Sequence, residues 1–106
     1  MLYNNDSQGT GSTMERDKAT QDVARDLQTE VWREVCEVFA VRRQEGLTQA
    51  ELARRMGLPR ERVHYWLSRA DRMTLAAAAR LMAGMNARLE CRARLEPTHA
   101  LSEAAE

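Results

Sequence analysis

The segment from Pro59 to Arg69 gathers base-recognising side chains on one face of an expected helix. At about 3.6 residues per turn, Val63, Trp66 and Leu67 point one way and the polar residues point the other. Arg60 could donate two hydrogen bonds to guanine O6 and N7, and Glu61 could accept one from cytosine N4. His64 and Tyr65 could contact a base edge, a thymine methyl group or a phosphate. The outward residues are Glu61, His64, Tyr65 and Ser68, with Arg60 and Arg62 on the flanks.

Each of these residues also has a purely structural interpretation. Glu61 lies in a first turn, where the helix dipole favours an anion, and Arg62 could be an ordinary surface arginine. Tyr65 lies almost opposite Val63, so we expect it to be exposed, whereas the spacing of Trp66 places it in the core. No histidine, cysteine or carboxylate cluster has the spacing of a metal site, so we expect no metal and no cofactor.

The chain around this face has the pattern of a helix-turn-helix unit that runs from Gln49 to Ser68. The fifth residue of the unit must be small because the two helices cross there, and it is Ala53. The ninth must turn through positive φ, and it is Gly57. The positions expected to form the shared core are all apolar: Leu52, Met56, Leu58, Val63 and Trp66.

The run Gly46-Leu47-Thr48-Gln49-Ala50-Glu51-Leu52-Ala53-Arg54-Arg55-Met56-Gly57 resembles the Cro/phage-repressor (XRE) helix-turn-helix family. The resemblance covers about residues 31–95 and implies a bundle of near five helices whose third helix enters the DNA major groove. It also implies that Gln49 contacts a phosphate from the start of the second helix. Pro59 departs from the family, which usually has a capping Ser or Thr there.

The charges favour a polyanionic partner for the middle of the chain. Residues 1–40 carry four cations and eight anions, residues 41–94 carry twelve arginines and five anions, and residues 95–106 carry three anions. The net charge of zero therefore hides a central segment of +7 between acidic ends. Within the basic segment, Arg43, Arg54 and Arg69 are candidate phosphate contacts.

The periodicity divides the chain into a tail over residues 1–13, a helical extension over 14–30, a domain over 31–95 and a second tail over 96–106. We expect helices over 20–45, 49–56, 59–69 and 75–85. The apolar stripe of the first helix rotates gradually around the helix axis, so we expect Val23 and Leu27 to pack against a different partner from Val35 and Phe39. The fold class is therefore all-α, a helix-turn-helix bundle of four to five helices.

The bundle is expected to end in a strand, because the hydrophobic period changes from 3.6 to 2 near residue 88. A lone strand needs a paired edge, and the economical partner is the same strand of a second copy. Pairing with the Leu2-Tyr3 region of the same chain is the alternative. An axis at Arg92 would set Glu90 against Arg94 and Arg88 against Glu96. The expected dimer interface consists of Leu89, Cys91, Ala93 and Leu95.

These patterns predict a DNA-binding transcriptional regulator, a repressor that binds a pseudo-palindromic operator as a homodimer. The alternative is an antitoxin or antiactivator that acts mainly on a cognate protein through its acidic N-terminal helix. No paired carboxylates, nucleophile-base set or glycine-rich phosphate loop is visible, so we do not expect an enzyme. Without a signal segment or an apolar run that could span a bilayer, we expect a cytoplasmic protein that does not bind membranes.

Overall fold

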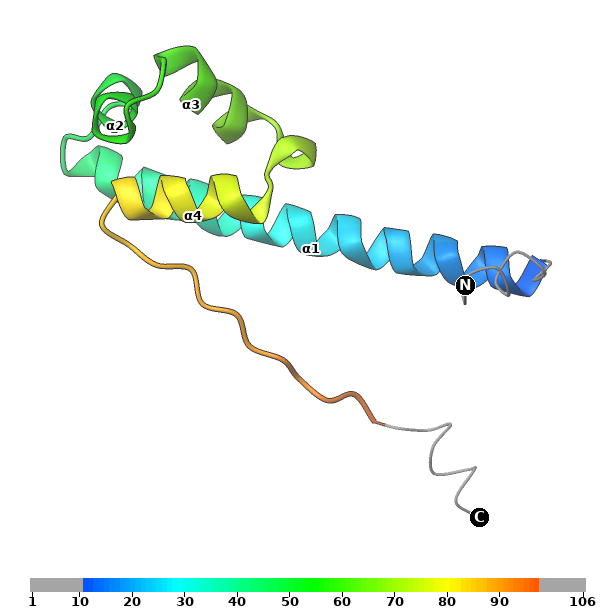
Figure 1. Cartoon of the computed structure of the whole chain (residues 1–106). Coiled ribbons are helices and arrows are strands. Elements are labelled where there is room, and N and C mark those ends of the chain that lie inside the picture. The colour runs from blue at the N-terminus through cyan, green and yellow to red at the C-terminus, as the bar shows by residue number, and fades with distance from the viewer. Residues whose placement is uncertain (1–10, 98–106) are drawn as a thin grey trace.

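The computed structural model describes residues 11–97, with side chains from residue 15 onward. Within this range every element of regular secondary structure is a helix, which agrees with the predicted all-α bundle but not with the predicted C-terminal strand. Helix α4 lies beside the C-terminal half of α1, and the α2–α3 pair sits on top of these two (Figure 1). No helix in this range is long and apolar enough to cross a membrane. The elements are α1 (Gly11–Gln44), α2 (Gln49–Met56), α3 (Arg60–Ser68), the 3₁₀ turn η2 (Ala70–Arg72) and α4 (Leu75–Gly84).

Local capping sets the limits of the short helices. The hydroxyl of Thr48 accepts a hydrogen bond of 3.1 Å from the Glu51 backbone N–H and begins α2. Thr74 does the same for α4, over 3.0 Å from Ala77 N–H. Gly57, with φ +69°, ends α2 in the left-handed conformation that a side chain would disfavour. Pro59 caps α3 without a side-chain hydrogen bond, which leaves the first turn of that helix open toward solvent.

The core sits where the four helices converge. Val35, Leu52, Val63 and Leu81, one from each helix, are fully buried. Gly84 lets α4 approach α2 closely, because a Cβ there would lie 2.7 Å from the Cδ1 of Leu52. Of the expected helix-turn-helix core, Leu52, Ala53 and Val63 are buried, and Met56, Leu58 and Trp66 are half-buried.

Helix α1 is much longer than its packed part. It begins at Gly11 rather than near residue 20, inside the segment expected to be a tail. Its N-terminal half projects beyond the bundle (Figure 1), where Val23 and Leu27 are 65% and 61% exposed. Val35 is buried, so the drifting stripe does present two different surfaces. The rest of the expected N-terminal tail, residues 1–10, lies outside the described residues.

The expected C-terminal strand is absent from the described part of the chain. Residues 87–97 carry no regular structure, and from residue 90 onward every described side chain is exposed. Leu89 is half-buried and packs against the core, whereas Leu95 is 94% exposed. The sequence alternation predicted a strand, but a strand forms only when its backbone groups pair with a neighbouring edge. Most of the expected second tail, residues 98–106, lies outside the described range.

Candidate nucleic-acid interface

The α2–α3 pair is fixed to the rest of the domain by side chains of α1. The indole Nε1 of Trp32 donates a hydrogen bond of 3.1 Å to the Leu67 carbonyl near the end of α3. One turn earlier, Gln28 Nε2 donates to the Met73 carbonyl over 3.0 Å and to the Asp71 carbonyl over 3.2 Å. These bonds satisfy carbonyls at the C-terminal end of α3 and in the following turn, and they set the direction in which α3 points.

One surface depression joins α1, α2 and α3. Arg43 of α1, Gln49 at the start of α2, and Arg60 and His64 of α3 line it together. Gln49 and His64 are in direct contact, with 3.3 Å between Gln49 Oε1 and His64 Nδ1. Residues expected to contact a phosphate and residues expected to read bases therefore lie on one continuous surface.

A second depression continues along α3 from the first. It shares Arg60 and His64 with the first depression. Eight of the nine residues predicted to contact DNA thus line these two adjoining depressions. Their roles as DNA contacts remain predictions. The residues that line the second depression are Arg60, Glu61, His64, Tyr65, Ser68 and Arg69.

Arg69 is engaged at the end of this surface. Its guanidinium carbon lies 5.6 Å from the centre of the Tyr65 ring, a cation–π arrangement. Its Nε and a terminal nitrogen each lie 3.3 Å from a carboxylate oxygen of Asp71. The hydrogen bond from Arg69 lowers the pKa of Asp71 below its ordinary value. Because both side chains are exposed to solvent, the ion pair orients Arg69 and Tyr65 more than it stabilises the fold.

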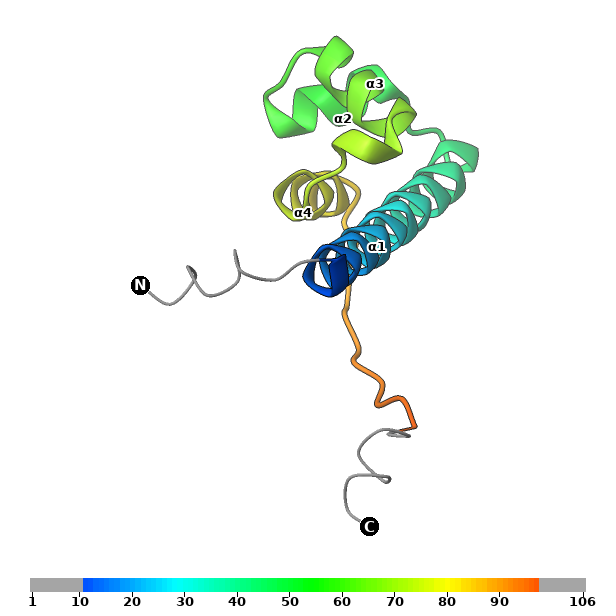
Figure 2. The ribbon, with the colours of Figure 1, turned by 90° about the vertical axis from the view of Figure 1, so that its right-hand side faces the viewer.

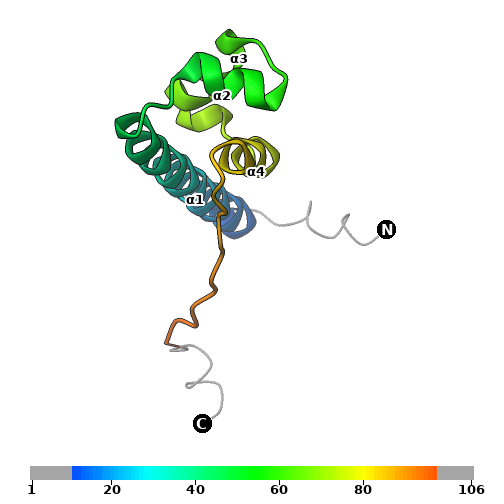
Figure 3. The same cartoon turned by 90° about the vertical axis from the view of Figure 1, so that its left-hand side faces the viewer.

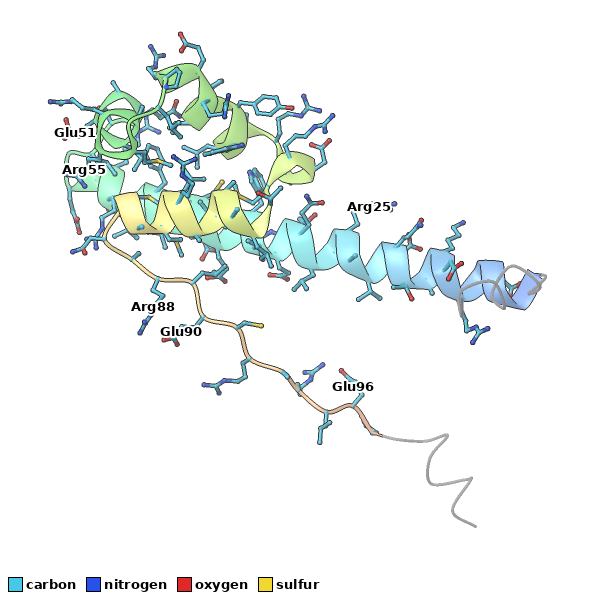
Figure 4. All side chains as sticks on the ribbon, viewed as in Figure 1. Arg25, Glu51, Arg55, Arg88, Glu90 and Glu96 are labelled. Carbon is cyan, nitrogen blue, oxygen red and sulfur yellow. The ribbon has the colours of Figure 1, made fainter. Side chains whose placement is uncertain are left out.

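Arg54 is the predicted phosphate contact that the structure does not bring into either depression. Its guanidinium pairs with the Glu51 carboxylate. Arg55 also reaches Glu51, over 3.5 Å, and donates to the Gly84 carbonyl over 3.1 Å (Figure 4). The two arginines of α2 are thus engaged with Glu51, and Arg55 connects α2 to α4.

Sequence reasoning missed the residues that position this surface. Trp32 and Gln28 donate hydrogen bonds to carbonyls 35 and 45 residues further along the chain. The one signal in the sequence was the four-residue spacing of Gln28 and Trp32, which puts both side chains on the same face of α1. The sequence placed Arg62 only on the flank of the recognition face or on the surface, whereas its guanidinium lies 5.7 Å from the Trp66 ring centre. This contact covers one side of a half-buried indole.

Part of the basic central segment lies away from this surface. The C-terminal segment leaves the bundle on the side opposite α2 and α3 (Figures 2 and 3). It carries Arg88, Arg92 and Arg94, so these arginines do not extend the surface formed by α3. The positive charge beside α3 comes instead from Arg43, Arg60 and their neighbours.

The family comparison decides what kind of unit this is. Residues 36–81 match the family model of sigma-70 region 4, a helix-turn-helix DNA-binding domain. The chain carries a helix-turn-helix DNA-binding domain. The matched residues run from the C-terminal third of α1 into α4 and include all of α2 and α3. No curated protein and no solved structure matches the chain. The match supports DNA binding and a role connected with transcription, but not the narrower Cro/phage-repressor assignment.

Proposed function

We propose that this protein is a sequence-specific transcriptional regulator of the Cro/phage-repressor type, a repressor that binds a pseudo-palindromic operator as a homodimer. In this proposal α3 lies in the major groove, and Arg60, Glu61 and Tyr65 read base edges. Gln49, Arg43 and Arg69 hold the phosphate backbone. The protein acts by occupying DNA and carries out no reaction.

The observation that carries the proposal is the continuous polar surface of α3. Arg60, Glu61, His64, Tyr65 and Ser68 are all exposed on one helix, and the buried Val63 faces the opposite way. Helix α3 packs against α2, and Trp32 of α1 donates a hydrogen bond to the Leu67 carbonyl near the C-terminal end of α3. A rigid helix with an exposed polar face is the arrangement that direct base readout requires.

Selection of bound sequences from a random duplex library at physiological salt tests the proposal. We expect an enriched motif with two half-sites about 34 Å apart, and affinity that falls steeply with salt as counterions are released. Arg60→Ala should weaken binding to the selected duplex by about 1–3 kcal/mol and relax preference at one base pair. Arg80→Ala is the matched control, because Arg80 is an exposed arginine of α4 that lines neither depression, and its loss should leave the affinity unchanged. Selection without an enriched motif would contradict the proposal.

The homodimer is proposed to form through residues 88–95. Support comes from the alternation of Leu89, Cys91, Ala93 and Leu95, and from the 94% exposure of Leu95. Pairing the segment with a second copy would supply the missing sheet edge and remove Leu95 from water. Cys91→Pro removes a ladder donor and should give a monomer in sedimentation while the helical circular dichroism remains. Ala93→Ser keeps every donor and should leave the dimer intact.

A second candidate function rests on the projecting half of α1. Leu27 and Leu75 are 61% and 72% exposed, and with Val31 and Met73 they line a groove between α1 and the segment that joins η2 to the start of α4. Asp22, Asp26 and Glu30 lie along the same part of α1. An antitoxin or antiactivator could bind a protein there, with DNA binding secondary. That function predicts weak, salt-sensitive DNA binding without sequence preference, so the same selection separates the two candidates.

A further inference from the structure

The guanidinium of Arg69 is held between a carboxylate and an aromatic ring at the C-terminal end of α3. Arg69 directly follows the last residue of that helix. Its Nε atom lies 3.3 Å from Oδ1 of Asp71, and its Nη2 atom lies 3.3 Å from Oδ2. The centre of the Tyr65 ring lies 5.6 Å from its Cζ atom. Two neighbours, one on α3 and one on η2, therefore restrict the orientation of one long side chain.

Asp71 can orient Arg69 because its own backbone is fixed to the bundle. Its carbonyl oxygen accepts a hydrogen bond of 3.2 Å from Nε2 of Gln28 on α1. The backbone N–H of Arg72 donates to the Arg69 carbonyl over 3.0 Å, which closes the turn around Asp71. The aspartate side chain is also short, whereas an arginine has several rotatable bonds and loses more entropy when it is ordered. The shorter, anchored partner thus sets the position of the longer one.

The geometry of this pair leaves one edge of the Arg69 guanidinium available to DNA. An arginine carries five N–H donors in a planar fork. Asp71 occupies the edge formed by Nε and Nη2, and the outer edge formed by Nη1 and Nη2 still presents two parallel N–H bonds. Two oxygens of one phosphate match such an edge. Arg69 can therefore bind a phosphate without leaving Asp71.

We propose that Asp71 is a positioning residue that presents the outer edge of Arg69 to a phosphate of the bound DNA. This inference rests on the proposed function, in which Arg69 contacts the phosphate backbone. The carboxylate does not cancel the attraction of this corner for DNA, because Nε of Arg72 lies 3.9 Å from the same carboxylate. Two guanidinium groups share one carboxylate, so the cluster keeps a net positive charge. Arg69 is thus oriented without making the corner repel a phosphate.

Replacing Asp71 with asparagine tests the proposal, because positioning and a simple charge effect predict opposite signs. If only net charge matters, loss of a carboxylate from this surface should strengthen binding to DNA. If Asp71 positions Arg69, Asp71→Asn should instead raise the Kd for the selected duplex by about threefold to tenfold, measured by fluorescence anisotropy at fixed salt. Glu45→Gln is the matched control, because Glu45 is an exposed carboxylate that pairs with Arg42 and lines neither depression. Its loss should not weaken binding.

A double-mutant cycle with Arg69→Gln shows whether Asp71 acts through Arg69. Arg69→Gln alone should weaken binding and lower the salt slope by about one. In that background Asp71→Asn should leave the Kd unchanged or lower it, because no guanidinium remains to be positioned. Weakening by Asp71→Asn that persists without Arg69 would overturn the proposal. Tighter binding of the single variant Asp71→Asn would also overturn it.

Stability and duplex preference separate this inference from the proposed function. The side chains of Arg69 and Asp71 are 48% and 61% exposed, so we expect both single variants to keep the wild-type urea midpoint. If the wild-type chain prefers the selected duplex and Asp71→Asn binds it with the same Kd, this inference alone is wrong. If the wild-type chain prefers no duplex, the proposed function is wrong and this inference is lost with it.

Discussion

Replacing Gly84 with alanine should destabilise the protein, although alanine is ordinarily the better helix residue. A Cβ at this position would lie 2.7 Å from Leu52 Cδ1 and 3.1 Å from Met56 Cγ. Leu52 is fully buried, so its methyl group cannot move toward solvent. Overpacking of this kind costs about 1–3 kcal/mol, whereas glycine to alanine in a helix gains at most about 1 kcal/mol. We expect a net loss of about 1–2 kcal/mol in the free energy of unfolding.

A double-mutant cycle measured by urea denaturation isolates the contact between the two helices. Leu52→Ala alone should cost about 3–5 kcal/mol, because it leaves a cavity in the core. In that background the nearest atom is gone, so Gly84→Ala should be neutral or stabilising by up to about 1 kcal/mol. Ala83→Gly, at an exposed position in the same turn, measures the helix preference without the contact. If Gly84→Ala raises the urea midpoint of the wild-type chain, the reasoning about close approach of α4 to α2 is refuted.

Three further outcomes can be checked on the folded protein. Trp32→Phe should lower the free energy of unfolding by about 1 kcal/mol, because the Leu67 carbonyl loses the indole N–H and keeps only the weaker hydrogen bond of 3.6 Å from the Cys36 thiol; an unchanged urea midpoint would contradict this. Thr48→Ala should cost about 1 kcal/mol through the lost cap of α2, and Thr48→Ser should recover most of it in the same assay. Burial raises the pKa of the Cys36 thiol, so less thiolate is present at a given pH. Alkylation followed by mass spectrometry should be slower at Cys36 than at the exposed Cys91 and should accelerate with rising pH; equal rates would argue against the packing of Cys36.

The parts of the fold that depend on neighbouring residues could be predicted from the sequence. Gly57 is required by a left-handed turn, Thr48 by a helix start, and Ala53 by a helix crossing, and each of these constraints acts within a few residues. The exposed face of α3 followed from the helical period alone, so Tyr65 was placed at the surface without knowledge of the bundle.

Other features could not be predicted because they depend on residues far apart or on a second chain. The pairing of Trp32 with the Leu67 carbonyl arises only when α1 passes beside the end of α3. The pairing of Arg69 with Asp71 is local, but either group could equally have faced solvent or a phosphate. The alternation of apolar and polar residues over 89–95 is the pattern that the two faces of a strand require. The pattern does not depend on whether a neighbouring strand is present to pair with it.

The length of α1 beyond the bundle gives one helix two levels of local stability. From Gln28 onward, packing against α4, η2 and α3 adds to the backbone hydrogen bonds. Before Gln28, Val23 and Leu27 are largely exposed, and an isolated helix of this length is only marginally stable in water. Amide hydrogen exchange should therefore slow progressively along α1 from its N-terminal half to residues 35–42. A molecule that binds the projecting half of α1 would slow amide exchange in that half first. By holding this half helical, it would also stabilise the rest of α1, whose side chains set the direction of α3.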